Sequence, residues 1–229
     1  MKKLLILILI LSINLSFSQD RTYWTDYKIT VKTSMDDLFV KKIDKILNDC
    51  DDVNKAFLSN LHFTEKFENG ENLYLTFTGS EPSDVYGGNC GSSMDWNEIS
   101  KITIWNSGSM GYSLMNFGDQ NYEGKFGMEY HINVKDPQTY ATAFSKMMND
   151  TKDISPEKFN AELGMYLMGR KSGISHYIWM EFETFDEMVK TTEKIFASKA
   201  FLEFNKTVSP IRELISTEMR KIGKRWQGN

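Results

Sequence analysis

Two stretches of alternating apolar and polar residues start the two halves of the chain. The apolar positions are Tyr27, Ile29 and Val31 in the first stretch and Tyr130, Ile132 and Val134 in the second. A period of two over this length predicts half-buried strands. A helical pattern ending in Asn-Asp follows each strand, so residues 25–49 and 126–150 form an internal repeat.

The helix of the second copy has clear start signals and one apolar face. Asp136 is a suitable N-cap, and Pro137 suits the first helical position, where its missing N–H costs nothing. Apolar side chains then recur at helical spacing, at Tyr140, Phe144, Met147 and Met148. A stripe of this kind is typical of a core face rather than of a cofactor site.

The rest of the second half predicts a hairpin, a helix and a closing strand. Gly173 supplies a turn between two apolar strands, and Thr184 with Glu187 forms a capping box. Residues 214–226 complete the unit as a final strand. The order β-α-β-β-α-β predicts a ferredoxin-like unit.

The first half follows the same plan less closely. Asn69-Gly70 predicts its hairpin turn, but the Gly/Ser-rich stretch after Thr78 forms helices poorly. We therefore expect a short helix around Asp95, or an ordered loop, followed by a strand over residues 99–105.

Four segments follow from these patterns. They are a signal peptide at residues 1–18, a degenerate first ferredoxin-like unit at 19–105, a linker at 106–125 and a second unit at 126–229. The linker is rich in Asn and Gly, which indicates slack between two units that pack together, with a lid as the alternative.

The second unit also resembles a known superfamily. Its segments VKDPQTYATAFSKMM, FETFDEM and AFLEFNKTVSPIRELISTEMRKIGKRW are similar to the dimeric α/β-barrel superfamily, which includes antibiotic-biosynthesis monooxygenase-like and NIPSNAP-like domains. The likeness covers residues 127–226 well and 25–105 loosely, and it is greatest to exported tandem members. It implies an α+β fold of two tandem ferredoxin-like units, packed sheet to sheet around a cavity as an intramolecular dimeric α/β barrel. Members include cofactor-free oxygenases, haem proteins and proteins without known activity, so the cofactor stays open.

The N-terminus indicates export. Residues 1–18 combine a basic start at Lys2 and Lys3, an apolar run and a small-residue end, which predicts a secretory signal peptide cut before Gln19. The alternative, a membrane anchor, needs a longer apolar run. We expect a periplasmic or secreted protein that leaves the membrane after cleavage.

Charge argues against a nucleic-acid partner. Loss of the two N-terminal lysines takes the formal net charge from −4 to −6. The basic tail at residues 220–226 is short and mixed with apolar residues, so we interpret it as a solvated strand. The expected partner is a small-molecule ligand, and the sequence leaves both a monomer and a homodimer open.

The two cysteines, Cys50 and Cys90, allow one disulfide in an oxidising compartment. The loop that holds Cys90 replaces a helix and needs another restraint, so we expect the two residues to lie close in space. Two independent thiols are the alternative. A catalytic role for Cys90 is disfavoured because no histidine lies near it in sequence to form the thiolate.

Strand alternation gathers polar and aromatic side chains on one sheet face. We expect this face to form a ligand pocket from Glu129, His131, Tyr177, Trp179 and Glu181, with Lys28, His62 and Tyr74 as counterparts in the first half. A sheet face that is polar only because water covers it is the alternative. Three histidines without a close pair predict no metal site.

The predicted function is an exported small-ligand-binding protein, or a cofactor-independent enzyme, with a pocket between the sheets. If the pocket is catalytic, His131 with Glu129 or Glu181 could do acid/base work. Haem ligation by His131 or His62 follows only from the resemblance, and no catalytic residue is assigned. The alternative is a non-catalytic interaction or stress-related module whose sheet faces serve packing.

Overall fold

The structure is a computed structural model and describes residues 21–48, 50, 55–64, 72–86, 90–169 and 172–227. The predicted signal peptide and the predicted Asn69-Gly70 turn lie outside these residues. In the first half the elements are β1 (Tyr23–Val31), α2 (Asp36–Asn48), β2 (Lys55–Phe63), β3 (Leu73–Gly79), α3 (Ser93–Ser100) and β4 (Thr103–Gly118). In the second half they are β5 (Phe126–Val134), α4 (Pro137–Asp150), β6 (Asn160–Met168), β7 (His176–Phe182), α5 (Phe185–Ala197), α6 (Lys199–Val208) and β8 (Arg212–Gln227).

The strands close into one antiparallel barrel. Going round it, the order is β4-β1-β3-β2-β8-β5-β7-β6, and β6 pairs with β4 to complete the circle. The α+β class is therefore confirmed. The halves are not two separate stacked sheets, because β2 pairs with β8 and β4 with β6, which joins them at both edges.

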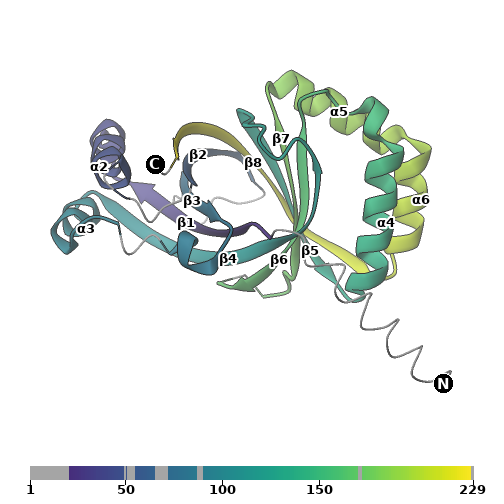
Figure 1. The fold of residues 1–229 in the computed structure, drawn as a ribbon, viewed down its shortest axis with the longest axis horizontal. Coiled ribbons are helices and arrows are strands. Elements are labelled where there is room, and N and C mark those ends of the chain that lie inside the picture. The colour runs from purple at the N-terminus through teal and green to yellow at the C-terminus, as the bar shows by residue number, and fades with distance from the viewer. Residues whose placement is uncertain are drawn as a thin grey trace.

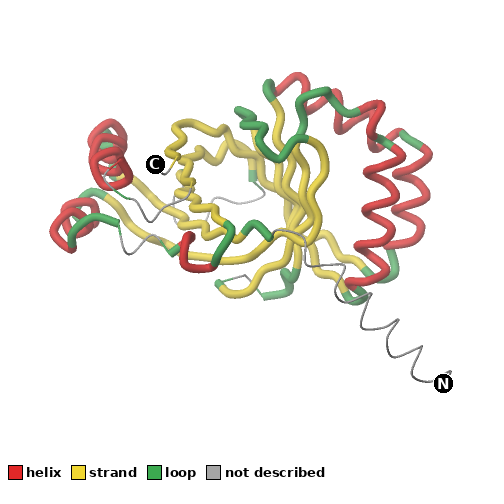
Figure 2. Tube along the Cα trace, viewed as in Figure 1, coloured by secondary structure: helices red, strands yellow, loops and turns green. Residues whose placement is uncertain are grey.

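The helices cover the outside of the barrel in two groups. Helices α2 and α3 lie at one side and α4, α5 and α6 at the other (Figure 1), so strands occupy the middle of the molecule (Figure 2). Each group buries its own apolar cluster against the outer strand faces. No helix of the described residues is long and apolar enough to cross a membrane.

The outward faces agree with the alternation seen in the sequence. Ile132 and Val134 belong to the cluster under α4, as do Met180 and Phe182 from the neighbouring strand. The caps are also as predicted, since the Asp136 side chain accepts a hydrogen bond from the Thr139 amide and starts α4. The alternate side chains, Glu129 and His131 of β5 and Tyr177, Trp179 and Glu181 of β7, point into the barrel.

Three predictions about elements need correction. Residues 106–118, predicted as part of a linker, belong to β4, where pairing with β1 and β6 overrides their poor strand propensity. The strand predicted from Ile99 begins only at Thr103, because Ile99 lies in α3, the short helix expected around Asp95. Helix α6 was not predicted as a separate element; the Ser198 side chain caps its start.

The two cysteines form a disulfide. The Cys50 and Cys90 sulfurs are bonded, and their Cα atoms lie 5.3 Å apart. The bridge ties the end of α2 to the segment before α3, and both residues are part of the apolar cluster beneath these helices.

Candidate functional site: the barrel cavity

The inner face of the first half is built from rows of residues across three neighbouring strands. The register places Trp24, Thr78 and Lys55 in one row of β1, β3 and β2. The rows of Asp26 with Thr76 and Phe57, and of Lys28 with Tyr74 and Ser59, follow further along the barrel. Because side chains alternate along a strand, residues two apart repeat on the same face. Polar positions two apart on β1 and β3 therefore all point inward.

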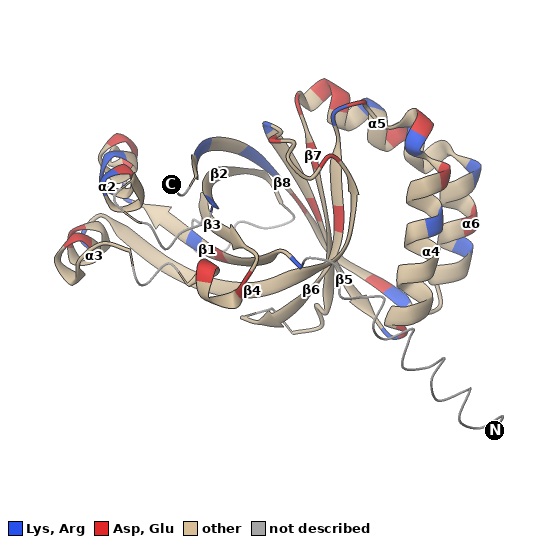
Figure 3. Ribbon diagram, viewed as in Figure 1, with Lys and Arg blue, Asp and Glu red and all other residues tan. Residues whose placement is uncertain are grey.

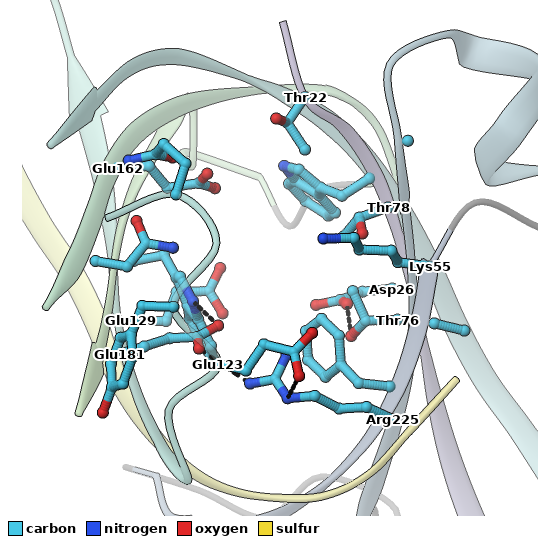
Figure 4. A pocket seen from close by; sticks show the side chains of 18 of the residues that line it. Thr22, Asp26, Lys55, Thr76, Thr78, Glu123, Glu129, Glu162, Glu181 and Arg225 are labelled. Carbon is cyan, nitrogen blue, oxygen red and sulfur yellow. Dashed lines mark hydrogen bonds and ion pairs between the residues drawn. The ribbon is translucent and has the colours of Figure 1, made fainter. Parts of the chain in front are cut away.

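One end of the barrel holds a cavity of about 310 Å³. Charged and aromatic residues from both halves line its inner part: Trp24, Asp26, Glu129, Tyr177 and Arg220 are buried and Trp179 is partly buried. Strand ends and the loop before β5 supply the residues nearer the opening, among them Arg21, Lys55, Thr78, Tyr122 and Arg225. Figure 4 shows the labelled side chains converging from all sides on this space. The volume lies at the lower end of the range for small-ligand pockets.

Glycines make room for the two large side chains that β7 contributes to the cavity wall. A Cβ on Gly127 would lie 2.0 Å from Cη2 of Trp179, and one on Gly164 would lie 2.1 Å from Cζ of Tyr177. Both contacts are far inside van der Waals distance, so each aromatic ring rests directly on a neighbouring strand. The cavity wall thus depends on small residues next to large ones.

Arg220 is the central charge of the barrel interior. Its guanidinium is 3% exposed, pairs with Asp26 at 2.8 Å and with Glu129, and lies over the Tyr74 ring at 3.7 Å from its centroid. Burial would lower the pKa of Arg220, but Glu129 and Asp26 raise it well above the ordinary value. Burial would likewise raise the pKa of Glu129, yet Arg220 and then His131 lower it. Arg220 and Glu129 are therefore both charged.

Glu129, His131 and Glu218 are the one group among the described residues with metal-ligand spacing. Their ligand atoms already have partners. Glu129 accepts from Tyr166 at 2.8 Å and pairs with His131 and Arg220, while Glu218 accepts from Tyr74 at 2.5 Å and pairs with Lys28 at 3.3 Å. Two protein cations, Arg220 and Lys28, thus already neutralise these carboxylates. This donor set fits an internal ion network better than a metal.

Glu162 differs from the other acids of the cavity. Its side chain accepts a 2.6 Å hydrogen bond from the Tyr177 hydroxyl, which in turn accepts one of 2.6 Å from the Trp24 indole N–H. Among the described residues no cation pairs with Glu162. Burial raises the pKa of Glu162 to about 7, against the effect of the Tyr177 bond, and the charges of Glu181, Glu129 and Asp26 raise it further. Near neutral pH this carboxyl is therefore present in both protonation states.

Glu181, another acid of the cavity wall, differs from Glu162 in having several hydrogen-bond donors and a cationic partner. It receives hydrogen bonds from the Trp179 indole at 3.0 Å and the Gly124 amide at 2.9 Å, and it pairs with Arg225 at 3.0 Å. Burial raises the pKa of Glu181, and Arg225 acts against that rise. A carboxylate held by this many donors is suited to a structural role.

The predicted pocket residues fall into three groups. Glu129, Tyr177, Trp179 and Glu181 line the cavity. Lys28, Tyr74 and His131 lie inside the barrel in the ion network; the ring of His131 contacts Ser216 at 2.8 Å through Nδ1. His62 is exposed and lies outside both groups, at a position where the pairing of β2 with β8 is irregular.

Several cavity residues were not predicted from the sequence: Asp26, Lys55, Glu162, Arg220 and Arg225. Arg220 corrects the interpretation of the basic tail as a solvated strand, because β8 is enclosed between β2 and β5. Figure 3 shows charged positions on the barrel strands as well as on the helices. The available signal for Glu162 was a single charge between the apolar residues Ala161 and Leu163 of a strand.

Haem, which the resemblance leaves open, requires an axial ligand such as His, Cys, Met or Tyr. No His, Cys or Met is found among the described residues that line the cavity. Burial raises the pKa of Tyr122 to about 12 and that of Tyr177 well above its ordinary value, which disfavours a tyrosinate ligand. The residues of this cavity therefore do not fit haem.

In comparisons with known proteins, no family model matches the chain and no curated protein matches it by sequence. Solved structures share its fold. A candidate monooxygenase from Lactobacillus acidophilus NCFM has a TM-score of 0.58 at 12% identity, covering 92% of this chain and 98% of its own. A candidate chlorite dismutase has a TM-score of 0.58 at 9% identity, covering 89% and 95%. A variant of the chlorite dismutase from Candidatus Nitrospira defluvii has a TM-score of 0.52 at 8% identity, covering 93% and 95%.

These similarities concern the fold alone. The chain shares its barrel architecture with these structures, and membership of the superfamily indicated by the sequence stays a prediction. The closer likeness to NIPSNAP-like domains stays a prediction.

Proposed function

We propose that the protein binds a small polar molecule in the barrel cavity and acts on it by proton transfer, with Glu162 as general acid and base and without a cofactor. One observation carries this proposal. Glu162 is a carboxyl on the cavity wall that no described cation neutralises, and its pKa of about 7 lets it both accept and donate a proton near neutral pH. The cavity also favours ligand binding over the alternative of a packing-only module.

The neighbours of Glu162 would act by orienting it. The Trp24 indole donates to the Tyr177 hydroxyl, which directs the Tyr177 proton towards Glu162. One carboxyl oxygen is thereby engaged, and the other is available for a substrate proton. Acid–base catalysis by such a group contributes typically 10²–10⁴-fold to a rate.

We further propose that the barrel consists of two tandem ferredoxin-like units. In both halves the strands lie in the order fourth, first, third, second, which is β4-β1-β3-β2 and then β8-β5-β7-β6. Export also remains a proposal. The Cys50–Cys90 disulfide supports it, because such bonds persist in oxidising compartments.

Proton abstraction can be tested without knowing the substrate. In 5-nitrobenzisoxazole, a base removes the ring C–H proton, the electrons of that bond form a nitrile, and the N–O bond breaks to give a coloured phenolate. We expect the protein to catalyse this reaction with a rate that rises with pH through an apparent pKa near 7. Glu162→Gln should lose about tenfold or more of that rate.

The matched control is Glu157→Gln, which changes an exposed glutamate outside the cavity and should leave the rate unchanged. A rate no higher than that of free acetate, or an equal rate in Glu162→Gln, would contradict proton transfer by Glu162.

A further inference from the structure

Two positively charged side chains at the cavity have no ionic partner among the described residues. Most charged residues on its wall pair with one another, as Asp26 and Glu129 do with Arg220, and Glu181 with Arg225. Lys55, the one lysine among the described residues that line the cavity, has no hydrogen bond or ion pair with any described residue. Arg21, also near the opening, lies over the Tyr112 ring at 4.7 Å from its centroid and has no ion pair with any described residue. Two cations are thus left to face the cavity.

Lys55 lies across the cavity from Glu162. In Figure 4 the two residues occupy opposite walls, and the Lys55 amine is directed towards the interior. Lys55 pairs with Thr78 of the neighbouring strand, and Trp24 lies one strand further along the same row. Thr78 has no hydrogen-bond partner for its hydroxyl in the described part of the chain. An amine and a free hydroxyl on adjacent strands are the donors that a carboxylate accepts from.

Aromatic rings stand among the charged residues of the cavity wall. Phe57, Trp24, Tyr177 and Trp179 supply them. Flat apolar surfaces with a few polar groups favour a flat ligand that is charged at one end. The cavity thus offers an anion site at Lys55 and Thr78, aromatic rings on its wall, and the Glu162 carboxyl on the opposite side.

We infer that the ligand is a small aromatic monoanion whose carboxylate binds Lys55 and Thr78 and whose opposite end reaches Glu162. This inference rests on the proposed function and names the class of molecule on which the cavity acts. An anion inside the cavity favours the neutral form of Glu162, so binding is coupled to uptake of a proton. Glu181 on β7, Glu129 on β5 and Asp26 on β1 are the other acids facing Glu162, and each already has a cationic partner.

Three probes of one shape separate the ligand classes: benzoate, benzyl alcohol and benzylammonium. Their binding is followed by tryptophan fluorescence, since Trp24 and Trp179 line the cavity. We expect benzoate to bind best. Its affinity should rise several-fold as the pH falls from 8 to 6 in the wild type and stay flat in Glu162→Gln.

The Lys55→Gln variant tests the anion site itself. It should weaken benzoate binding by about three- to fivefold, the effect of losing one exposed ion pair, and leave benzyl alcohol unaffected. Lys158→Gln, which changes an exposed lysine outside the cavity, is the matched control. The three probes have the same ring and head groups of similar size, so differences between them report the charge and hydrogen bonding of the head group.

The outcomes distinguish the anion inference from the proposed function on which it rests. Equal or tighter binding of benzylammonium or benzyl alcohol would overturn the anion inference and leave ligand binding intact. An unchanged benzoate affinity in Lys55→Gln would overturn the assignment of Lys55. If none of the three probes binds, ligand binding in this cavity is wrong, and the anion inference is overturned with it.

Discussion

At the scale of single residues, Glu162 links the stability of the protein to pH. An unfolded glutamate has a pKa of about 4.3, whereas in the folded barrel burial raises the pKa of Glu162 to about 7. Folding therefore favours the protonated form. Below the unfolded pKa, Glu162 costs the folded state no stability. As the pH rises from about 4.3 to about 7, the free energy of unfolding falls, and above that range the loss is complete.

Glu162→Gln removes this penalty because glutamine stays neutral and can still accept the Tyr177 hydrogen bond. We expect the variant to be more stable than the wild type by about 2–4 kcal/mol at pH 8 and equal to it near pH 4. Urea unfolding followed by circular dichroism at both pH values measures the difference, with Glu157→Gln as the control. A stability difference that does not depend on pH would refute the shifted pKa.

At the scale of elements, the close approach of β6 and β7 depends on a missing side chain. Gly164 allows the Tyr177 ring to lie flat against β6, where its hydroxyl reaches Glu162. Gly164→Ala would place a Cβ 2.1 Å from the ring. Overpacking of this kind costs typically 1–3 kcal/mol and displaces the side chain.

The expected result of Gly164→Ala is a lower urea midpoint together with a loss of the Glu162-dependent activity. Gly223→Ala is a matched control, because its Cβ would meet its nearest atom, the Leu58 carbonyl oxygen, at 3.3 Å. If both variants were equally stable and active, the proposed positioning of Tyr177 by β6 would be wrong.

Elements with strong local signals could be predicted, and those formed by pairing could not. The alternation around Ile132 and the Asp136 cap identify β5 and α4, because both signals act within a few residues. Residues 106–118 have the composition of a loop, and only their two neighbouring strands make them part of β4. The site residues show the same difference. Glu129 and Trp179 could be predicted from strand alternation, whereas Lys55 and Arg220 belong to the site because β2 pairs with β8.

At the scale of the whole molecule, closure explains why so many charges tolerate burial. The ion pair of Arg220 with Asp26 joins the two halves, since Asp26 lies on β1 and Arg220 on β8, while its pair with Glu129 of β5 lies within the second half. A barrel without free edges excludes water from these pairs while strands from both halves supply the partners. The same closure leaves the cavity at one end, so the fold and the site arise from the same strand pairing.

The disulfide restrains the half of the molecule that is less regular. It connects residues 40 positions apart, and in the chain-entropy model closing a loop of this length stabilises a protein by roughly 3–4 kcal/mol. We expect the double variant Cys50→Ser with Cys90→Ser to lose about that much stability against urea. Benzoate binding should be retained in the folded double variant, because neither cysteine lines the cavity.

Thiol counting on denatured, unreduced protein provides the independent check on this bond. We expect no free thiol per chain before reduction and two after it, since the chain has two cysteines. Two free thiols before reduction would contradict the bond. A double variant as stable as the wild type would instead show that the apolar cluster around Cys50 and Cys90 holds α2 and α3 in place without the covalent link.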